Sequence, residues 1–118
     1  MNNIQVSKNF KLKEFQCKDG SQLVKIDSQL LKKLQQLRDT IGKPIIINSG
    51  YRTPEYNKKV GGAKNSYHMK GQAVDIRISG LKPEEIAKIA EKIGFTGIGI
   101  YKNFVHLDIR PIKTIWYG

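Results

Sequence analysis

Two short segments of the chain, residues 72–78 and 104–109, alternate apolar and polar side chains in the way that half-buried β-strands do. The apolar faces hold Val74, Ile76 and Ile78 in the first segment and Val105, Leu107 and Ile109 in the second. The opposite faces carry Asp75 in the first segment and His106 and Asp108 in the second. Because alternate residues of a strand point to the same side of a sheet, two such strands side by side would present these polar groups to one cleft.

The rest of the sequence predicts two amphipathic helices and further short strands. The expected elements are a helical turn at Leu12–Phe15 in an otherwise irregular lead-in, a helix between Asp27 or Ser28 and Gly42, a strand at Ile45–Ile47, a short helix beginning at Pro54, a loop over 61–71, a helix from Pro83 to Gly94, a strand at Gly97–Tyr101, and a final segment that packs Trp116 onto the body. This order favours an α+β fold with a small, mostly antiparallel sheet flanked by helices. With 118 residues, we expect a single domain over 1–118.

Composition limits the classes of site and partner. The chain has one cysteine, Cys17, so an internal disulfide framework and zinc sites with two or more cysteines are excluded. Its formal net charge of +11 favours a polyanionic partner, which could be nucleic acid or an anionic bacterial envelope. The basic residues are dispersed along the sequence, so an ordinary solvated surface is an equally simple explanation of the charge.

The two histidines of the chain, His68 and His106, together with Asp75 form a candidate three-ligand metal set. Two imidazoles and one carboxylate leave a fourth position for water, as in catalytic zinc sites. An isolated histidine is more often structural or merely exposed than a metal ligand. Two features favour the metal: Asp75 and His106 occupy polar faces of apolar strands, and glycines at positions 61, 62 and 71 let the His68 loop approach closely.

Two further residues are candidates for a catalytic or substrate-binding role at such a site. Asp108 follows His106 by two residues on the same strand face, so it could accept a proton from water or orient an imidazole as a second carboxylate. It could also simply pair with Arg77 or Arg110. Arg52 could bind a substrate carboxylate or stabilise an oxyanion, and in isolation it would be an ordinary arginine in a turn.

Three motifs carry a resemblance to a known family: I-N-S-G-Y-R-T-P-E-Y-N, S-Y-H-M-K-G-Q-A-V-D-I and G-I-G-I-Y-K-N-F-V-H-L-D. With them, from about residue 8 to Trp116, the chain resembles the zinc D-Ala-D-Ala metallopeptidases. These are peptidoglycan carboxypeptidases and endopeptidases that share a fold with the hedgehog signalling domain. The resemblance implies a small antiparallel sheet flanked by helices, with one zinc ion in a cleft on the sheet.

The resemblance also assigns roles to individual residues. It implies that His68, Asp75 and His106 bind the zinc ion. Arg52 matches an arginine that steadies the transition state or the substrate carbonyl. Ser66 matches a residue that contacts the carboxylate end of the substrate.

The sequence departs from the family pattern where a general base is often found. Many relatives have Glu or Asp three residues before the second histidine, and here that residue is Asn103. Others have a histidine two residues before it, and here that residue is Phe104. Asparagine cannot take a proton. Either Asp108 serves as the base, or the activity is altered or lost.

Taken with the resemblance, the sequence predicts a zinc metallopeptidase that cuts peptidoglycan stem peptides or cross-links, compatible with a phage or prophage endolysin. The alternative is a non-catalytic, zinc-stabilised binding module of the same fold. A specific nucleic-acid binder is disfavoured, since the charge is dispersed and no aromatic-basic motif is present. A carboxypeptidase, a D,D-endopeptidase and an L-alanyl-D-glutamate endopeptidase remain open.

The sequence also suggests where such a protein would act. No apolar stretch approaches the length of a membrane span, and the first ten residues lack the apolar core of a secretory signal. We therefore expect a protein made in the cytoplasm, without a membrane span, that reaches the anionic bacterial cell wall by another route. We expect a monomer.

Overall fold

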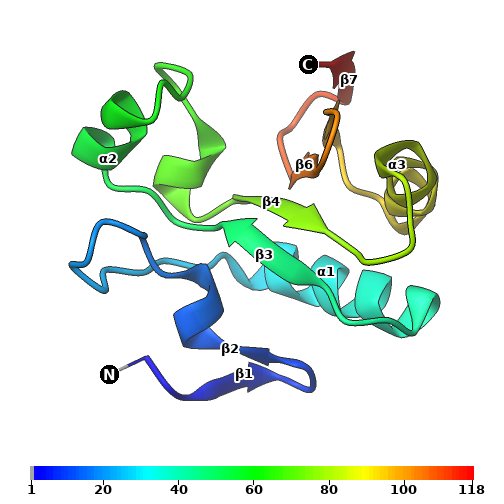
Figure 1. Cartoon of the computed structure of the whole chain (residues 1–118), viewed down its shortest axis with the longest axis horizontal. Helices are drawn as coiled ribbons and strands as arrows, with labels where there is room; N and C mark the ends of the chain where they lie inside the picture. The colour runs from blue at the N-terminus through cyan, green and yellow to red at the C-terminus, as the bar shows by residue number, and fades with distance from the viewer. Residues whose placement is uncertain (1) are drawn as a thin grey trace.

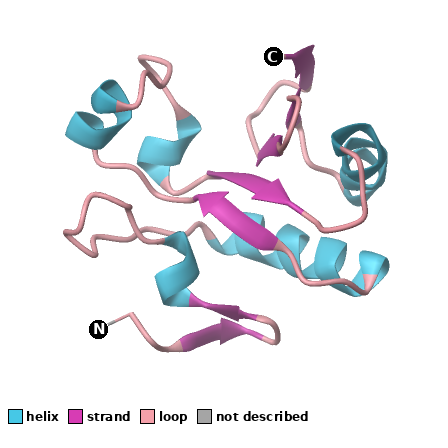
Figure 2. Cartoon of the chain, viewed as in Figure 1, coloured by secondary structure: helices cyan, strands magenta, loops and turns pink. Residues whose placement is uncertain are grey.

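A five-stranded sheet forms the centre of the computed structural model, which describes residues 2–118 (Figures 1 and 2). The strand order is β3-β4-β6-β5-β7, and neighbours are antiparallel except for the parallel pair β5 and β7. Two further strands, β1 and β2, form a separate antiparallel pair. The strands are β1 (Gln5–Ser7), β2 (Phe10–Lys11), β3 (Ile46–Ser49), β4 (Ala73–Arg77), β5 (Gly97–Ile100), β6 (Val105–Asp108) and β7 (Thr114–Tyr117).

Two helices, α1 (Ser28–Ile41) and α3 (Pro83–Ile93), pack on one face of the sheet. The Asp27 side chain caps α1 by accepting hydrogen bonds from the backbone N–H groups of Gln29 and Leu30. The apolar stripes of both helices and the apolar faces of the strands are buried together in one cluster, which supplies the main hydrophobic stabilisation. Its fully buried members include Leu30, Leu34, Leu37, Val74, Ile76, Ile86, Ala90, Ile98, Val105 and Leu107.

The connection between β3 and β4 carries the other helical segments, α2 (Pro54–Lys59) and the 3₁₀ turn η2 (Tyr67–Lys70), at one end of the sheet (Figure 1). A further 3₁₀ turn, η1 (Leu12–Phe15), precedes α1. Gly71 ends η2 with a φ of +68°, and a Cβ there would lie 2.7 Å from the carbonyl oxygen of Lys25. This residue therefore needs both the backbone freedom and the small size of glycine to return the chain into β4.

One transverse row of residues crosses the whole sheet on the face away from α1 and α3. The strand register aligns Ser49, Asp75, His106, Gly99 and Trp116 as successive neighbours on β3, β4, β6, β5 and β7. Asp75 and His106 are therefore directly opposite each other. The alternation in the sequence had placed both on polar faces, and the register now places them side by side.

The predicted α+β class and the mostly antiparallel sheet are confirmed. The helical turn at Leu12–Phe15, the two amphipathic helices, and the strands β5 and β6 also occur where the sequence indicated them. His68, which was expected in a loop, lies in the turn η2.

Two expectations about the chain ends were incomplete. The lead-in contains the β1–β2 hairpin, whose strands of three and two residues are too short to show a period in the sequence. The segment that carries Trp116 is a strand, β7, and it pairs in parallel with β5. Its sequence T-I-W-Y is rich in strand-forming residues, but it is only four residues long and mostly exposed, so it is not typical of a buried strand. No helix within residues 2–118 is long and apolar enough to cross a membrane.

We predict that Leu107→Ala destabilises the protein by about 2–5 kcal/mol, because Leu107 is fully buried between the two site residues of β6 and its loss leaves a cavity. Urea denaturation followed by circular dichroism would measure the change. Ile112→Ala is the matched control, since that side chain is 79% exposed and its truncation should change stability by less than about 0.5 kcal/mol. Similar losses in both variants would contradict the packing described here.

Candidate metal centre

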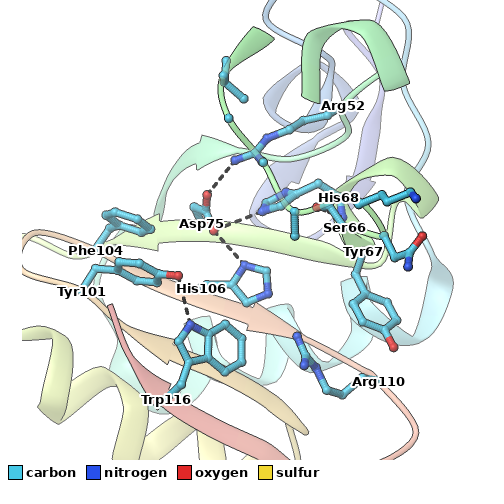
Figure 3. Close-up of a pocket in the computed structure, with 16 residues that line it drawn as sticks. Arg52, Ser66, Tyr67, His68, Asp75, Tyr101, Phe104, His106, Arg110 and Trp116 are labelled. Atoms are coloured by element: carbon cyan, nitrogen blue, oxygen red, sulfur yellow. Dashed lines mark hydrogen bonds and ion pairs between the residues drawn. The ribbon is translucent and has the colours of Figure 1, made fainter. Parts of the chain in front are cut away.

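Three potential metal ligands converge on one point above the sheet (Figure 3). His68 comes from η2, Asp75 from β4 and His106 from β6, and their ligand atoms all lie within 4.8 Å of one another. Asp75 Oδ1 is 3.2 Å from His68 Nε2 and 3.0 Å from His106 Nδ1. The structure therefore brings together the three residues that the sequence singled out.

The distances from Asp75 Oδ1 to the two imidazole nitrogens fit a tetrahedral metal ion. Zinc binds imidazole nitrogen and carboxylate oxygen at about 2.0–2.2 Å, so neighbouring ligand atoms of a tetrahedral site are about 3.3 Å apart. The contacts of Asp75 Oδ1 with the two imidazoles, at 3.2 and 3.0 Å, are close to this value. A set of two nitrogens and one oxygen also suits zinc chemically.

The ring of His68 is held in the orientation that a ligand needs. Its Nδ1 lies 2.7 Å from the carbonyl oxygen of Gly50. A carbonyl can only accept a hydrogen bond, so Nδ1 carries a hydrogen, and in the neutral ring that a metal requires the lone pair would be on Nε2, the nitrogen nearer Asp75. Ser66 caps η2 by accepting a hydrogen bond from the backbone N–H of His68, which fixes the backbone at the same place.

The ring of His106 is held from its other side by a buried ion pair. Its Nε2 donates a hydrogen bond of 2.7 Å to Asp108 Oδ2, and the Asp108 side chain is 0% exposed. Arg110 binds the same carboxylate with two nitrogens, Nε to Oδ1 at 2.9 Å and Nη2 to Oδ2 at 2.6 Å. A Cβ at Gly97 would lie 1.8 Å from Asp108 Oδ1, so the carboxylate occupies space that only glycine leaves free.

These contacts set the protonation of the pair. Burial alone would raise the pKa of Asp108, but hydrogen bonds from His106 and Arg110 hold it well below its usual range. Burial would lower the pKa of His106, and its hydrogen bonds to Asp108 and Asp75 raise it instead. Asp108 is therefore firmly ionised, and its position favours the orienting role that we considered for it. Its role as a general base stays a prediction.

Arg52 is turned toward the metal ligands and is engaged by three partners. Its Nη2 lies 3.2 Å from Asp75 Oδ2, its Nε donates to Ser49 Oγ at 3.0 Å, and its Nη1 donates to Asn57 Oδ1 at 3.2 Å. Burial would raise the pKa of Asp75, but the hydrogen bonds from His106 and His68 hold it well below its usual range. The contact with Arg52 fixes the second oxygen of Asp75 and leaves Oδ1 for the metal.

The ligands form one wall of a cavity of about 690 Å³. Arg52 and Ser66 also line it, as expected for residues that contact substrate, although those roles stay predictions. Part of the lining is aromatic: Tyr101 and Phe104 stack with ring centres 4.5 Å apart. Asn103, which occupies the position of the usual base, is exposed and does not line the cavity.

Sequence reasoning missed Trp116 as a site residue. Its indole lies 5.3 Å from the His106 ring, and its Nε1 donates to the Tyr101 hydroxyl at 3.0 Å. A Cβ at Gly99 would lie 2.6 Å from the indole, so the ring reaches His106 across a bare stretch of β5. The alternating glycines of G-I-G-I were the available signal, because Gly97 and Gly99 share the site face.

Comparison with known proteins agrees with this geometry. A sequence model of the peptidase M15 family matches residues 8–108. The chain belongs to the peptidase M15 family. The resemblance to the zinc D-Ala-D-Ala peptidases is thereby confirmed.

Relatives in this family are named for peptidoglycan or zinc. The chain is 35% identical to a probable peptidoglycan L,D-endopeptidase of Haemophilus influenzae, over 86% of this chain and 59% of that protein. It is 37% identical to the peptidoglycan L,D-endopeptidase of Escherichia coli K12, over 80% and 57%. It is 43% identical to the zinc D-Ala-D-Ala carboxypeptidase of Streptomyces albus G, over 56% and 26%. The chain thus spans less than two thirds of the length of these relatives.

We predict that Asp108→Asn lowers the stability of the metal-free protein by about 1.5–3 kcal/mol at pH 7, because charged hydrogen bonds to His106 and Arg110 are weakened. Because the pKa of Asp108 is lowered in the folded protein, its contribution to stability is complete above its unfolded-state pKa of about 4. That contribution is lost as the pH falls below this value. The melting temperatures of wild type and variant should therefore converge from pH 6 to pH 2.

Differential scanning fluorimetry in the presence of chelator would measure this convergence. Glu84→Gln removes an exposed carboxylate from the first turn of α3 and serves as the control, with an effect of a few tenths of a kcal/mol. A constant gap between wild type and Asp108→Asn over this pH range would contradict the ionised, hydrogen-bonded state of Asp108.

Proposed function

We propose that this protein is a zinc-dependent peptidase that hydrolyses peptide bonds of peptidoglycan. The observation that carries the proposal is the convergence of two imidazoles and one carboxylate, with ligand atoms within 4.8 Å of one another, on the wall of a cavity. Family membership supports the peptidase chemistry, and the names of the relatives support zinc and peptidoglycan.

The residues that would hold zinc are His68 through Nε2, Asp75 through Oδ1 and His106 through Nδ1. When bound in such a set, zinc supplies a Lewis acid for the scissile carbonyl and lowers the pKa of a water molecule to about 7. The chain keeps the ligands ready: the Gly50 carbonyl orients His68, the Asp108 carboxylate orients His106, and Arg52 holds the distal oxygen of Asp75.

The remaining residues of the cavity would bind and orient the peptide. We assign Arg52 a part in steadying the charge that develops on the carbonyl oxygen, because its guanidinium lines the cavity beside Asp75. Ser66 lines the cavity next to His68, in a position suited to a substrate contact. Asp108 acts in this proposal by orienting His106, and cleavage that persists in Asp108→Ala would exclude it as the proton shuttle.

We further propose endopeptidase cleavage at a bond between L- and D-residues. The two relatives named L,D-endopeptidases align with 80% or more of this chain, whereas the zinc carboxypeptidase aligns with 56%. The net charge of +11 would support contact with an anionic cell wall as the place of action. An endolysin origin and a monomeric state stay predictions.

We predict that the zinc-loaded protein releases new peptides from purified peptidoglycan, and that mass spectrometry of the digest identifies an L,D bond as the cleavage site. Chelation should abolish the release and added zinc should restore it. His68→Ala should reduce the rate more than about a hundredfold, since it removes one of the three ligands.

Lys88→Ala is the matched control, because Lys88 is exposed on α3, behind the sheet, and its loss should leave cleavage unchanged. The non-catalytic binding module that the sequence left open predicts a different result. In that case zinc binds with the same dependence on His68, but no new peptide appears with any preparation.

A further inference from the structure

Arg110 lines the cavity, and its ion pair with Asp108 engages only part of its guanidinium. Its Nε and one N–H of Nη2 point to the Asp108 carboxylate, at 2.9 and 2.6 Å. An arginine side chain has five N–H groups, so the two on Nη1 and the second on Nη2 are not engaged by this pair. Two of these three, one on Nη1 and one on Nη2, form the end-on fork of the guanidinium, which is a geometry that binds a carboxylate with two parallel hydrogen bonds.

The guanidinium is also fixed in place. Its Cζ lies 4.8 Å from the centre of the Trp116 ring and 5.0 Å from that of Tyr67, and Figure 3 shows Arg110 between the two. The Arg110 backbone N–H donates to Asp108 Oδ1 at 3.0 Å, and its carbonyl accepts from Thr96 Oγ1 at 2.6 Å. A charged group that is already ordered loses little freedom on binding, so it can contribute most of its hydrogen-bond energy to a ligand.

The charge of the cavity favours an anion. Of the described residues that line it, Arg52, Lys64 and Arg110 are basic and Asp75 is acidic. Asp75 is the metal ligand of this set, and Arg52 is turned toward it and toward Ser49 and Asn57. Arg110 lies on the other side of His106, where it is linked to the ring through Asp108.

We propose that Arg110 is a specificity-determining residue that binds a free carboxylate of the substrate peptide on the Trp116 side of the metal centre. The inference rests on the proposed peptidase function, and it adds that peptides with a free carboxylate at this place are preferred over the corresponding amides. Tyr67 and Trp116 are positioning residues that keep the fork of Arg110 directed along the cavity wall.

The test uses synthetic peptidoglycan peptides. Each free carboxylate of the peptide is supplied, one at a time, as the acid or as the primary amide. Both cleavage by the zinc-loaded protein and binding of the uncleaved peptides, measured by calorimetry, are recorded. Wild type should prefer the free acid at one position by about tenfold or more, mainly through KM and the binding constant. Arg110→Lys keeps a positive charge beside Asp108 but loses the planar fork, so the ratio of acid to amide, in cleavage and in binding, should fall towards one whatever the change in overall rate.

Two further variants separate substrate recognition from a structural role. Arg38→Lys makes the same exchange on α1, behind the sheet, and should keep the wild-type preference. Tyr67→Leu removes one flanking ring without touching Asp108 and should reduce the preference. Zinc affinity of Arg110→Lys, measured by competition with a chromophoric chelator, reports separately how far the weakened contact with Asp108 disturbs the metal site.

The inference is overturned if wild type treats every acid and amide pair alike in both measurements. It is also overturned if Arg110→Lys lowers zinc affinity and affects acid and amide equally, since Arg110 would then serve only to hold Asp108. Absence of cleavage by wild type would instead remove the proposed function, and the binding preference in calorimetry would still decide the role of Arg110.

Discussion

A single carboxylate oxygen, Asp75 Oδ1, stands at the centre of the site, 3.2 Å from one imidazole and 3.0 Å from the other. This arrangement depends on the register of β4 and β6, which places Asp75 directly opposite His106. A slip of one residue would turn the ligand of either strand toward the helices and bring an apolar residue to the site. The buried cluster under α1 and α3 prevents such a slip, because it needs Val74, Ile76, Val105 and Leu107 on its own side.

Two glycines of β5 make room for the side chains that surround the metal ligands. Gly97 leaves room for the Asp108 carboxylate, and Gly99 leaves room for the Trp116 indole. At these two positions the site face of β5 therefore has no side chain. Over this face, Asp108 accepts a hydrogen bond from His106, and the Trp116 ring lies against the His106 ring. Mutation of neighbouring groups that fix the orientation of a metal-bound imidazole commonly lowers metal affinity or activity by about 10–100-fold.

The sequence was informative where the alternation of apolar and polar residues determines a strand and its two faces. Alternation in residues 72–78 and 104–109 was enough to predict the strands and the faces on which Asp75 and His106 lie. It was not enough for groups whose role depends on distant packing. From the sequence Asp108 could be a base, an orienting carboxylate or a partner of an arginine, and only the structure reveals its contacts with His106 and Arg110. Trp116 could not be placed at the site, because its approach depends on a parallel pairing between β7 and β5 that has no local signature.

The central claim is that Asp75 Oδ1, His68 Nε2 and His106 Nδ1 bind one zinc ion. A crystal structure of the zinc-loaded protein, with anomalous scattering measured on both sides of the zinc edge, tests it most directly. The account predicts one zinc peak within about 2.0–2.2 Å of these three atoms, with His106 bound through Nδ1 while its Nε2 stays on Asp108. A peak elsewhere, or a His106 ring that is turned to bind through Nε2, would contradict it.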